Sequence, residues 1–155
     1  MRLPGDSAGP ELKERASVDY KSISKDVIGH LYKAHHAIRV AEIDETLIAL
    51  AELRVAQLVG CAYCCAFHSG ELRQMGVDQS VIDKIPGWRH SSAFDDKQLL
   101  VLAWTEALSI PSGDLDALRE RLAVAFTEKE LVDLTASISL MNALTRMRIA
   151  LGEKV

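Results

Sequence analysis

The chain has 155 residues, of which 48% are hydrophobic, so it is long enough for one domain with a substantial buried core. Its 18 Lys and Arg residues against 22 Asp and Glu residues give a formal net charge of -4, which argues against a nucleic-acid partner. Aromatic residues make up only 5% of the chain, and because strands are enriched in aromatic and β-branched residues, the composition favours an all-α fold.

The N-terminal segment, residues 1–16, contains prolines, glycines and mixed charges without periodicity, which predicts a flexible tail ahead of a domain at residues 17–155. It develops no apolar run of the length found in secretory signal peptides. No later stretch reaches the roughly 20 apolar residues that a membrane-spanning helix needs. We therefore expect a cytoplasmic protein without a membrane segment.

Helical spacing of apolar residues predicts two helices before the first cysteine. The first follows Asp19 and carries the stripe Val27, Leu31, Ala34 and Ile38. The second follows Asp44 and ends where Gly60 supplies a residue suited to a left-handed C-terminal turn.

A third helix is predicted over residues 61–75, because this run contains no proline and is followed by Gly76. Asp78 then suggests the N-cap of a short helix, which Pro86 and Gly87 are expected to terminate before a loop at residues 88–92.

Three further helices complete the predicted fold. One contains residues 99–107 and closes before a turn at residues 111–113, and a short one starts at about Asp114. The last opens with a capping box formed by Thr127 and Glu130 and ends at Gly152. No segment alternates with period two, so we predict a bundle of about six or seven helices.

The three cysteines, Cys61, Cys64 and Cys65, are clustered and odd in number, which indicates chemistry or metal binding rather than a structural disulfide framework. On a helix, Cys61 and Cys64 lie about 60° apart, and His68 lies about 40° from Cys64. These three side chains therefore share one face. Cys65 is turned about 100° from Cys64, and we expect it to be a buried, inert thiol.

This arrangement suits redox chemistry. A thiol at a helix N-terminus feels the positive end of the helix dipole, and an imidazole one turn later can take its proton. A second thiol three residues away can then convert a sulfenic acid into a disulfide before further oxidation.

An acidic residue is expected to orient His68, and Glu52 is the candidate. Glu52 precedes Gly60 by eight residues and His68 follows it by eight, so two helices folded back at Gly60 bring both to a level about 12 Å from the turn. Glu71, three residues after His68, is the competing partner, but we expect it to be a solvated acid.

These residues lie within long runs that resemble the alkylhydroperoxidase D-like branch of the carboxymuconolactone decarboxylase family. The runs are "LRVAQLVGCAYC" with the following His68, "MGVDQSVIDKIPGWRHSSAFDDKQLLVLAWTEAL" and "TEKELVDLTASISLMNALTRMRIALG", and the resemblance covers roughly residues 20–152. It implies an all-helical oligomer, a trimer or hexamer, that reduces hydroperoxides with electrons from an external dithiol and needs no metal or flavin.

The resemblance also implies roles for individual residues. Cys64 would be the thiol that attacks the peroxide, Cys61 the more accessible resolving thiol, and His68 the proton relay. The best-known form of the motif places its glutamate twelve residues before the first cysteine. That position is Ala49 here, and Glu52 is the nearest acid.

Three alternative functions remain open at this stage. The cysteine pair with His68 and either Glu52 or Cys65 could bind zinc, although one helix face does not easily surround a tetrahedral ion. The chain could instead be a carboxymuconolactone decarboxylase-like lyase or a helical redox sensor that does not turn over. Covalent haem and a thioredoxin fold are disfavoured, because Cys65 follows the pair where haem attachment needs a histidine and no strands are predicted.

Other polar and aromatic residues receive structural interpretations. His35 and His36 lie near the end of the first predicted helix, where a capping role is expected. Trp88 and His90 are expected to pack, and Tyr63 to form a wall of the site.

Overall fold

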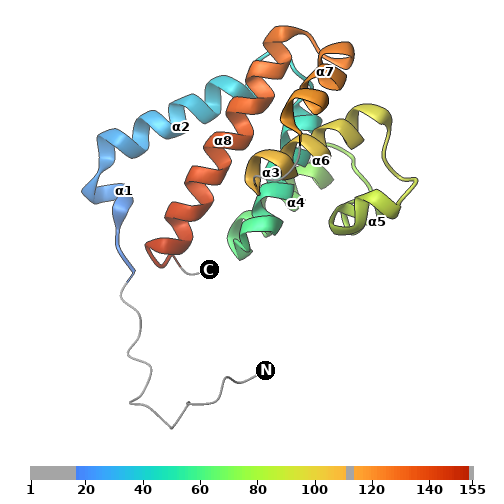
Figure 1. Cartoon of the computed structure of the whole chain (residues 1–155). Helices are drawn as coiled ribbons and strands as arrows, with labels where there is room; N and C mark the ends of the chain where they lie inside the picture. The colour runs from blue at the N-terminus through green and yellow to red at the C-terminus, as the bar shows by residue number, and fades with distance from the viewer. Residues whose placement is uncertain (1–16, 111–113, 154–155) are drawn as a thin grey trace, which may run out of the picture.

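The computed structural model describes residues 17–110 and 114–153, whose regular secondary structure is helical with no strand among them (Figure 1). The predicted all-α fold is therefore confirmed. The predicted flexible tail at residues 1–16 and the predicted turn at residues 111–113 lie outside the described residues. In chain order the elements are α1 (Tyr20–Ile23), α2 (Lys25–Arg39), α3 (Glu45–Val59), α4 (Ala62–Gln74), α5 (Gln79–Ile82), the 3₁₀ helix η1 (Ile85–His90), α6 (Asp96–Ser109), α7 (Leu115–Ala125) and α8 (Glu128–Ala150).

Helix α3 is the centre of the bundle, and it packs against α4, α6 and α8. It is buried along most of its length, because its sequence presents apolar residues on every side. The Asp44 carboxylate caps its first turn, and Gly60 ends it in the left-handed conformation with a φ of 80°. Both ends match the predicted boundaries.

Helix α8 is the longest element and crosses the molecule between α2 on one side and α3 and α4 on the other (Figure 1). Its predicted capping box is present, because the Thr127 hydroxyl accepts from the Glu130 backbone and the Glu130 carboxylate accepts from the Thr127 backbone. The chain leaves α8 through Gly152 at a φ of 76°, as predicted. The segment before α1 contacts this end of α8, where the Val18 amide donates a hydrogen bond to the Leu151 carbonyl.

The first predicted helix differs from the structure in two ways. It is interrupted at Ser24, which separates α1 from α2. Its buried face is also displaced by one residue, because Val27 is 58% exposed whereas Ile28 is buried. The reason is that α2 turns polar residues, His35 and Arg39, toward the interior of the bundle, which an apolar stripe cannot reveal.

Pro86 was expected to terminate a helix, and this prediction is wrong. Helix α5 already ends at Ile82, and Pro86 lies in the first turn of η1, where its missing N–H group costs no hydrogen bond. Trp88 and His90, expected in a loop, belong to the same 3₁₀ helix. The short helix predicted after Asp78 is present as α5, and the separate α1 and the 3₁₀ helix η1 explain why the described residues form more pieces than the predicted number.

No helix in the described ranges combines the length and the apolar character that crossing a membrane requires.

Candidate functional site

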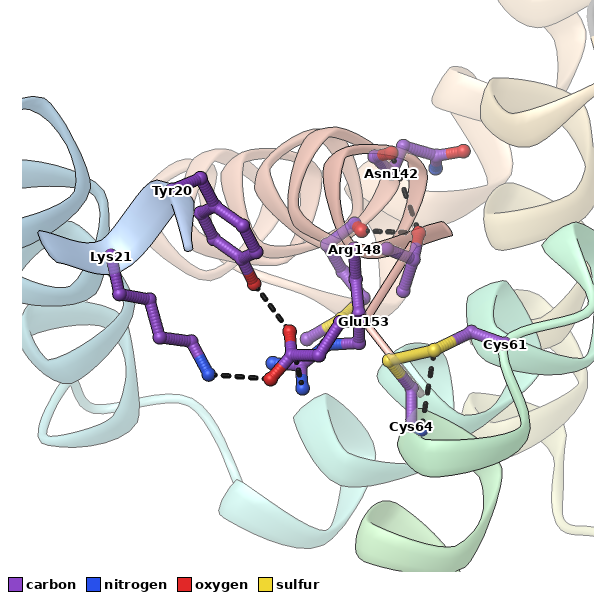
Figure 2. The surroundings of a disulfide bond; sticks show 9 residues. Tyr20, Lys21, Cys61, Cys64, Asn142, Arg148 and Glu153 are labelled. Atoms are coloured by element: carbon purple, nitrogen blue, oxygen red, sulfur yellow. Dashed lines mark hydrogen bonds and ion pairs between the residues drawn. A yellow bond between two sulfur atoms is a disulfide. The ribbon is translucent and has the colours of Figure 1, made fainter. Parts of the chain in front are cut away.

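The cysteine pair lies at the start of α4, directly after the left-handed turn at Gly60 (Figure 2). Cys61 is the N-cap residue with extended backbone, and its sulfur accepts a hydrogen bond of 3.3 Å from the Cys64 amide. The two sulfurs are bonded to each other, across a Cα–Cα distance of 5.3 Å. Both residues are buried, so the pair occupies the positive end of the α4 dipole in a dry setting.

The two cysteines are not equally placed, and the difference contradicts one expectation. Cys61 is 2% exposed and Cys64 is 5% exposed, and Cys64 is the one of the two that lines the described pocket shared with His68. Cys61 was expected to be the more accessible thiol. It is not, because its N-cap position turns the sulfur back over the first turn of α4 and packs the residue against Ala56.

Cys65 lies on another side of α4. It is unpaired and lines a separate pocket with Gln57 and Ser69. Burial raises the pKa of its thiol, which disfavours the reactive thiolate. This agrees with the prediction that Cys65 is turned away from the pair.

His68 lies one turn after Cys64 on α4, is 3% exposed and lines the same pocket as Cys64. Its Nδ1 atom is 2.7 Å from Oε2 of Glu71 and 3.4 Å from Oε2 of Glu52. The sequence-predicted Glu52 therefore does reach His68, but Glu71 is the nearer partner. Glu71 is not the solvated acid that was expected, since only 22% of its side chain is exposed.

Arg39 of α2 joins the two carboxylates. Its Nη2 atom donates to Oε2 of Glu52 at 2.5 Å and to Oε2 of Glu71 at 2.7 Å. The guanidinium is 8% exposed, so α2 brings a nearly buried cation against Glu52 of α3 and Glu71 near the end of α4. This contact withdraws Glu71 from solvent and holds it against His68.

Glu52 is fully buried and receives further hydrogen bonds on its other oxygen. Nε2 of His35 and the hydroxyl of Ser137 each lie 3.0 Å from Oε1. Its partners therefore come from α2, α4 and α8. A buried carboxylate needs such hydrogen-bond and charge partners, because its transfer out of water is otherwise costly. His35 was expected to cap its own helix, and instead it binds this carboxylate.

Both carboxylates are held in the ionised form. Burial alone would raise the pKa of Glu52, but the hydrogen bond from His35 and the charge of Arg39 outweigh it, and the pKa lies below its usual value. For Glu71 burial is likewise outweighed, by the hydrogen bond with His68 and the charge of Arg39, so its pKa is also lowered. The glutamates raise the pKa of Arg39 despite its burial.

Glu52, His68 and Glu71 also form a group whose donor atoms lie within 4.8 Å of one another. A divalent cation would sit between the two carboxylates. Nη2 of Arg39 already bridges them there, so the donor set does not fit a metal ion. In the disulfide form, Cys61 and Cys64 offer no thiolate to a metal ion, and among the described residues the group of possible ligands does not include them.

Sequence reasoning missed two members of the network, Arg39 and Ser137. A signal for Arg39 exists, because it lies four residues after His35 and therefore on the same face of α2. Ser137 carries no such signal, since only the packing of α8 against α3 brings its hydroxyl to Glu52.

A pocket of about 280 Å³ opens beside Cys64, between α2, α4 and α8. Tyr63 forms part of its wall, as predicted, and its ring stacks on Phe67 with centroids 6.0 Å apart. The lining residues are Lys21, Tyr32, His35, Tyr63, Cys64, Phe67, His68, Met141, Leu144 and Arg148. A small molecule in this pocket would contact the Cys64 sulfur and the His68 ring together.

Comparison with known sequences identifies relatives of this chain. A model of the carboxymuconolactone decarboxylase family matches residues 28–107. The uncharacterized protein YdfG of Bacillus subtilis is 27% identical over 139 residues, which are 88% of this chain and 95% of that protein. The uncharacterized protein YnjA of Escherichia coli is 33% identical over 111 residues, which are 70% of this chain and 60% of that protein.

Two solved structures share the fold. One is a protein of unknown function from Agrobacterium tumefaciens, described as a putative antioxidant defence protein AhpD, with a TM-score of 0.84, 22% identity, and coverage of 90% of this chain and 97% of that one. The other is an uncharacterized peroxidase-related protein from Silicibacter sp., with a TM-score of 0.71, 16% identity, and coverage of 79% and 66%.

Proposed function

The chain belongs to the carboxymuconolactone decarboxylase family, and from its AhpD-like fold and its cysteine pair we propose that it is a thiol-dependent peroxidase. One observation carries the proposal. Cys64 and His68 line one pocket at the N-terminus of α4, with Cys61 bonded to Cys64 and a carboxylate on the far nitrogen of His68. The proposed substrate is a hydroperoxide, and the proposed reductant is an external dithiol.

In the proposed reaction His68 acts through its Nε2 atom. Nδ1 faces the carboxylates of Glu71 and Glu52, so it carries a proton, and the neutral ring then has its basic lone pair on Nε2. Nε2 accepts the proton of the Cys64 thiol and afterwards returns it to the leaving alkoxide. Glu52, Glu71 and Arg39 position the ring and compensate the positive charge that it gains.

The proposed cycle oxidises Cys64, closes the Cys61–Cys64 disulfide and then reduces it. The Cys64 thiolate attacks one peroxide oxygen, the O–O bond breaks, and the products are an alcohol and the Cys64 sulfenic acid. The Cys61 thiol attacks the Cys64 sulfur, which releases water and forms the disulfide. An external dithiol then reduces this disulfide by exchange, supplying two electrons and two protons.

The proposal is tested with the reduced protein, an alkyl hydroperoxide and excess dithiothreitol. We expect repeated turnover with one alcohol formed per dithiol consumed, loss of turnover in Cys64→Ser and Cys61→Ser, and retained turnover in the matched control Cys65→Ser. Without dithiol, peptide mapping after oxidation should find Cys61 linked to Cys64. A Cys64–Cys65 bridge, or turnover in the Cys61→Ser, Cys64→Ser double variant, would contradict the proposal.

Self-association into trimers or hexamers and a cytoplasmic location stay predictions.

A further inference from the structure

The pocket beside Cys64 has an unusual charge. Its basic lining residues are Lys21, Arg148, His35 and His68. Among the residues that the structure describes, no carboxylate lines this pocket. The chain as a whole is acidic, with a net charge of -4, so a positive pocket is a local feature and not a reflection of composition.

The two permanent cations come from opposite ends of the described chain and meet at Glu153 (Figure 2). Lys21 Nζ donates to Oε1 of Glu153 at 2.6 Å, and Tyr20 donates its hydroxyl to Oε2, also at 2.6 Å. Arg148 Nη1 lies 3.1 Å from the same Oε2 atom. One carboxylate therefore faces two cations, and one positive charge remains uncompensated in this group.

Arg148 is held in place more firmly than a surface arginine. Its guanidinium lies 4.1 Å from the centroid of the Tyr63 ring, and only 12% of the side chain is exposed. Within the described part of the chain, its buried Nη1 atom makes no hydrogen bond, although Glu153 is close. The N–H groups on Nη1 of Arg148 are therefore available to donate hydrogen bonds to a second carboxylate.

The rest of the wall is apolar or aromatic. Tyr32, Phe67, Met141 and Leu144 line it, and both Tyr32 and Phe67 are partly exposed at its edge. Its volume of about 280 Å³ lies just below the usual range for ligand pockets, roughly 300–1,000 Å³. Such a space suits a short apolar body with one anionic end.

We infer that this pocket selects hydroperoxides that carry a carboxylate on a short apolar body, with Arg148 and Lys21 as the residues that bind the carboxylate. This inference rests on the proposed peroxidase function. The carboxylate binds beside or in place of Glu153, the apolar body lies against Phe67 and Met141, and the peroxide group faces Cys64. Glu153 is the internal competitor for the same two cations.

Binding can be measured without turnover, by calorimetry of the oxidised protein with octanoate and its neutral analogue octanamide. We expect octanoate to bind roughly tenfold more tightly. Arg148→Gln should remove that preference and Lys21→Gln should reduce it, whereas Glu153→Gln should tighten octanoate binding because the competitor is gone. The exposed pair of Arg119 and Asp116 lies elsewhere, so Arg119→Gln is the matched control.

Opposite shifts in Arg148→Gln and Glu153→Gln distinguish carboxylate binding from a structural role of the cluster. If the cluster only fastens the two ends of the chain, both variants weaken binding and lower the melting temperature together. Equal affinity for octanoate and octanamide in the unmodified protein would overturn the inference.

Turnover supplies the second test, with a hydroperoxy carboxylic acid and its methyl ester as substrates. The ratio of kcat/KM for the acid to that for the ester should exceed one, fall about tenfold in Arg148→Gln and rise in Glu153→Gln. An unchanged ratio in these variants would overturn the inference. If neither compound is reduced, the proposed peroxidase function fails, and the octanoate measurement still decides whether the pocket binds carboxylates.

Discussion

Two glutamates in this molecule, one fully buried and one partly buried, are surrounded in similar ways. Glu52 on α3 contacts Arg39, His35, His68 and Ser137. Glu106 on α6 accepts hydrogen bonds from Arg54, Trp88 and Arg89, with Nε1 of Trp88 at 2.8 Å. Each carboxylate joins several helices through an arginine.

Both glutamates are held ionised. For Glu106, as for Glu52, burial alone would raise the pKa, and the hydrogen bonds from Trp88, Arg89 and Arg54 outweigh it. The pKa of Glu106 therefore lies below its usual value, and ion pairing by itself does not tell the two clusters apart.

The two clusters differ in what they can do with a proton. Guanidinium and indole N–H groups keep their protons throughout the working range of pH, so the Glu106 cluster is fixed. The Glu52 cluster includes two imidazoles, His35 and His68, whose ring nitrogens can donate or accept a proton, and both line the pocket of Cys64. A histidine ring beside a thiol, and not ion pairing, distinguishes the candidate site.

The largest expected effect comes from removing that ring. His68→Asn should lower kcat/KM for peroxide reduction by about 100- to 10,000-fold, because His68 is the group that we propose to move the Cys64 proton. Trp88→Phe removes one donor from Glu106 and serves as the matched control, with activity within about twofold of the unmodified protein. Steady-state assays measure both variants. Equal loss of activity in the two would mean that the histidine ring does not distinguish the Glu52 cluster from the Glu106 cluster.

Removing the buried cation should cost stability. Arg39→Met leaves Glu52 buried without its charge partner, and we expect unfolding to become easier by about 3–5 kcal/mol. Arg54→Met acts on the more exposed Glu106 and should cost about 1–3 kcal/mol. Urea unfolding measures both, and equal losses would mean that the two clusters are energetically alike.

Neutralising the glutamates separates positioning from stability. Glu52→Gln should lower kcat/KM by about 10- to 100-fold and broaden the pH profile, because His68 loses one of the charges that support its protonated form. Glu106→Gln should lower the melting temperature and leave kcat/KM within about twofold. A pH profile unchanged by Glu52→Gln would assign that residue a purely structural role.

The smallest expected effect is the pH dependence of stability. Glu52, Glu71 and Glu106 all have folded-state pKa values below the usual 4.5. Their contribution is therefore fully present above pH 4.5 and is lost as pH falls through the folded-state values. Melting temperatures from pH 3 to 6 should decline on the acid side, and Glu52→Gln or Glu106→Gln should each flatten that decline.

Much of the site follows from local sequence rules. The spacing of Cys61, Cys64 and His68 places them on one turn of helix, and Gly60 fixes where that helix starts. The equal distances of Glu52 and His68 from Gly60 were enough to predict their proximity, because α3 and α4 are adjacent in the chain and pack together.

The remainder depends on packing between distant elements. Glu71 looks solvated on α4 alone, and only the approach of α2 with Arg39 buries it. His35 and Arg39 face the interior, which also explains why the buried face of α2 differs from the predicted apolar stripe. Because these inward positions carry polar residues, the spacing of apolar residues does not reveal them. Likewise, the meeting of Lys21, Arg148 and Glu153 joins the two ends of the described chain, which no local pattern indicates.

The most direct test is the ionisation of Cys64 in the reduced Cys61→Ser, Cys65→Ser variant, where it is the only cysteine. Thiolate absorbance near 240 nm, followed against pH, gives the midpoint. We predict a midpoint at least one pH unit below the value of about 8.5 for a free thiol, and a return toward that value when His68→Asn is added. An ordinary midpoint in both proteins would contradict the proposed activation of Cys64 by His68.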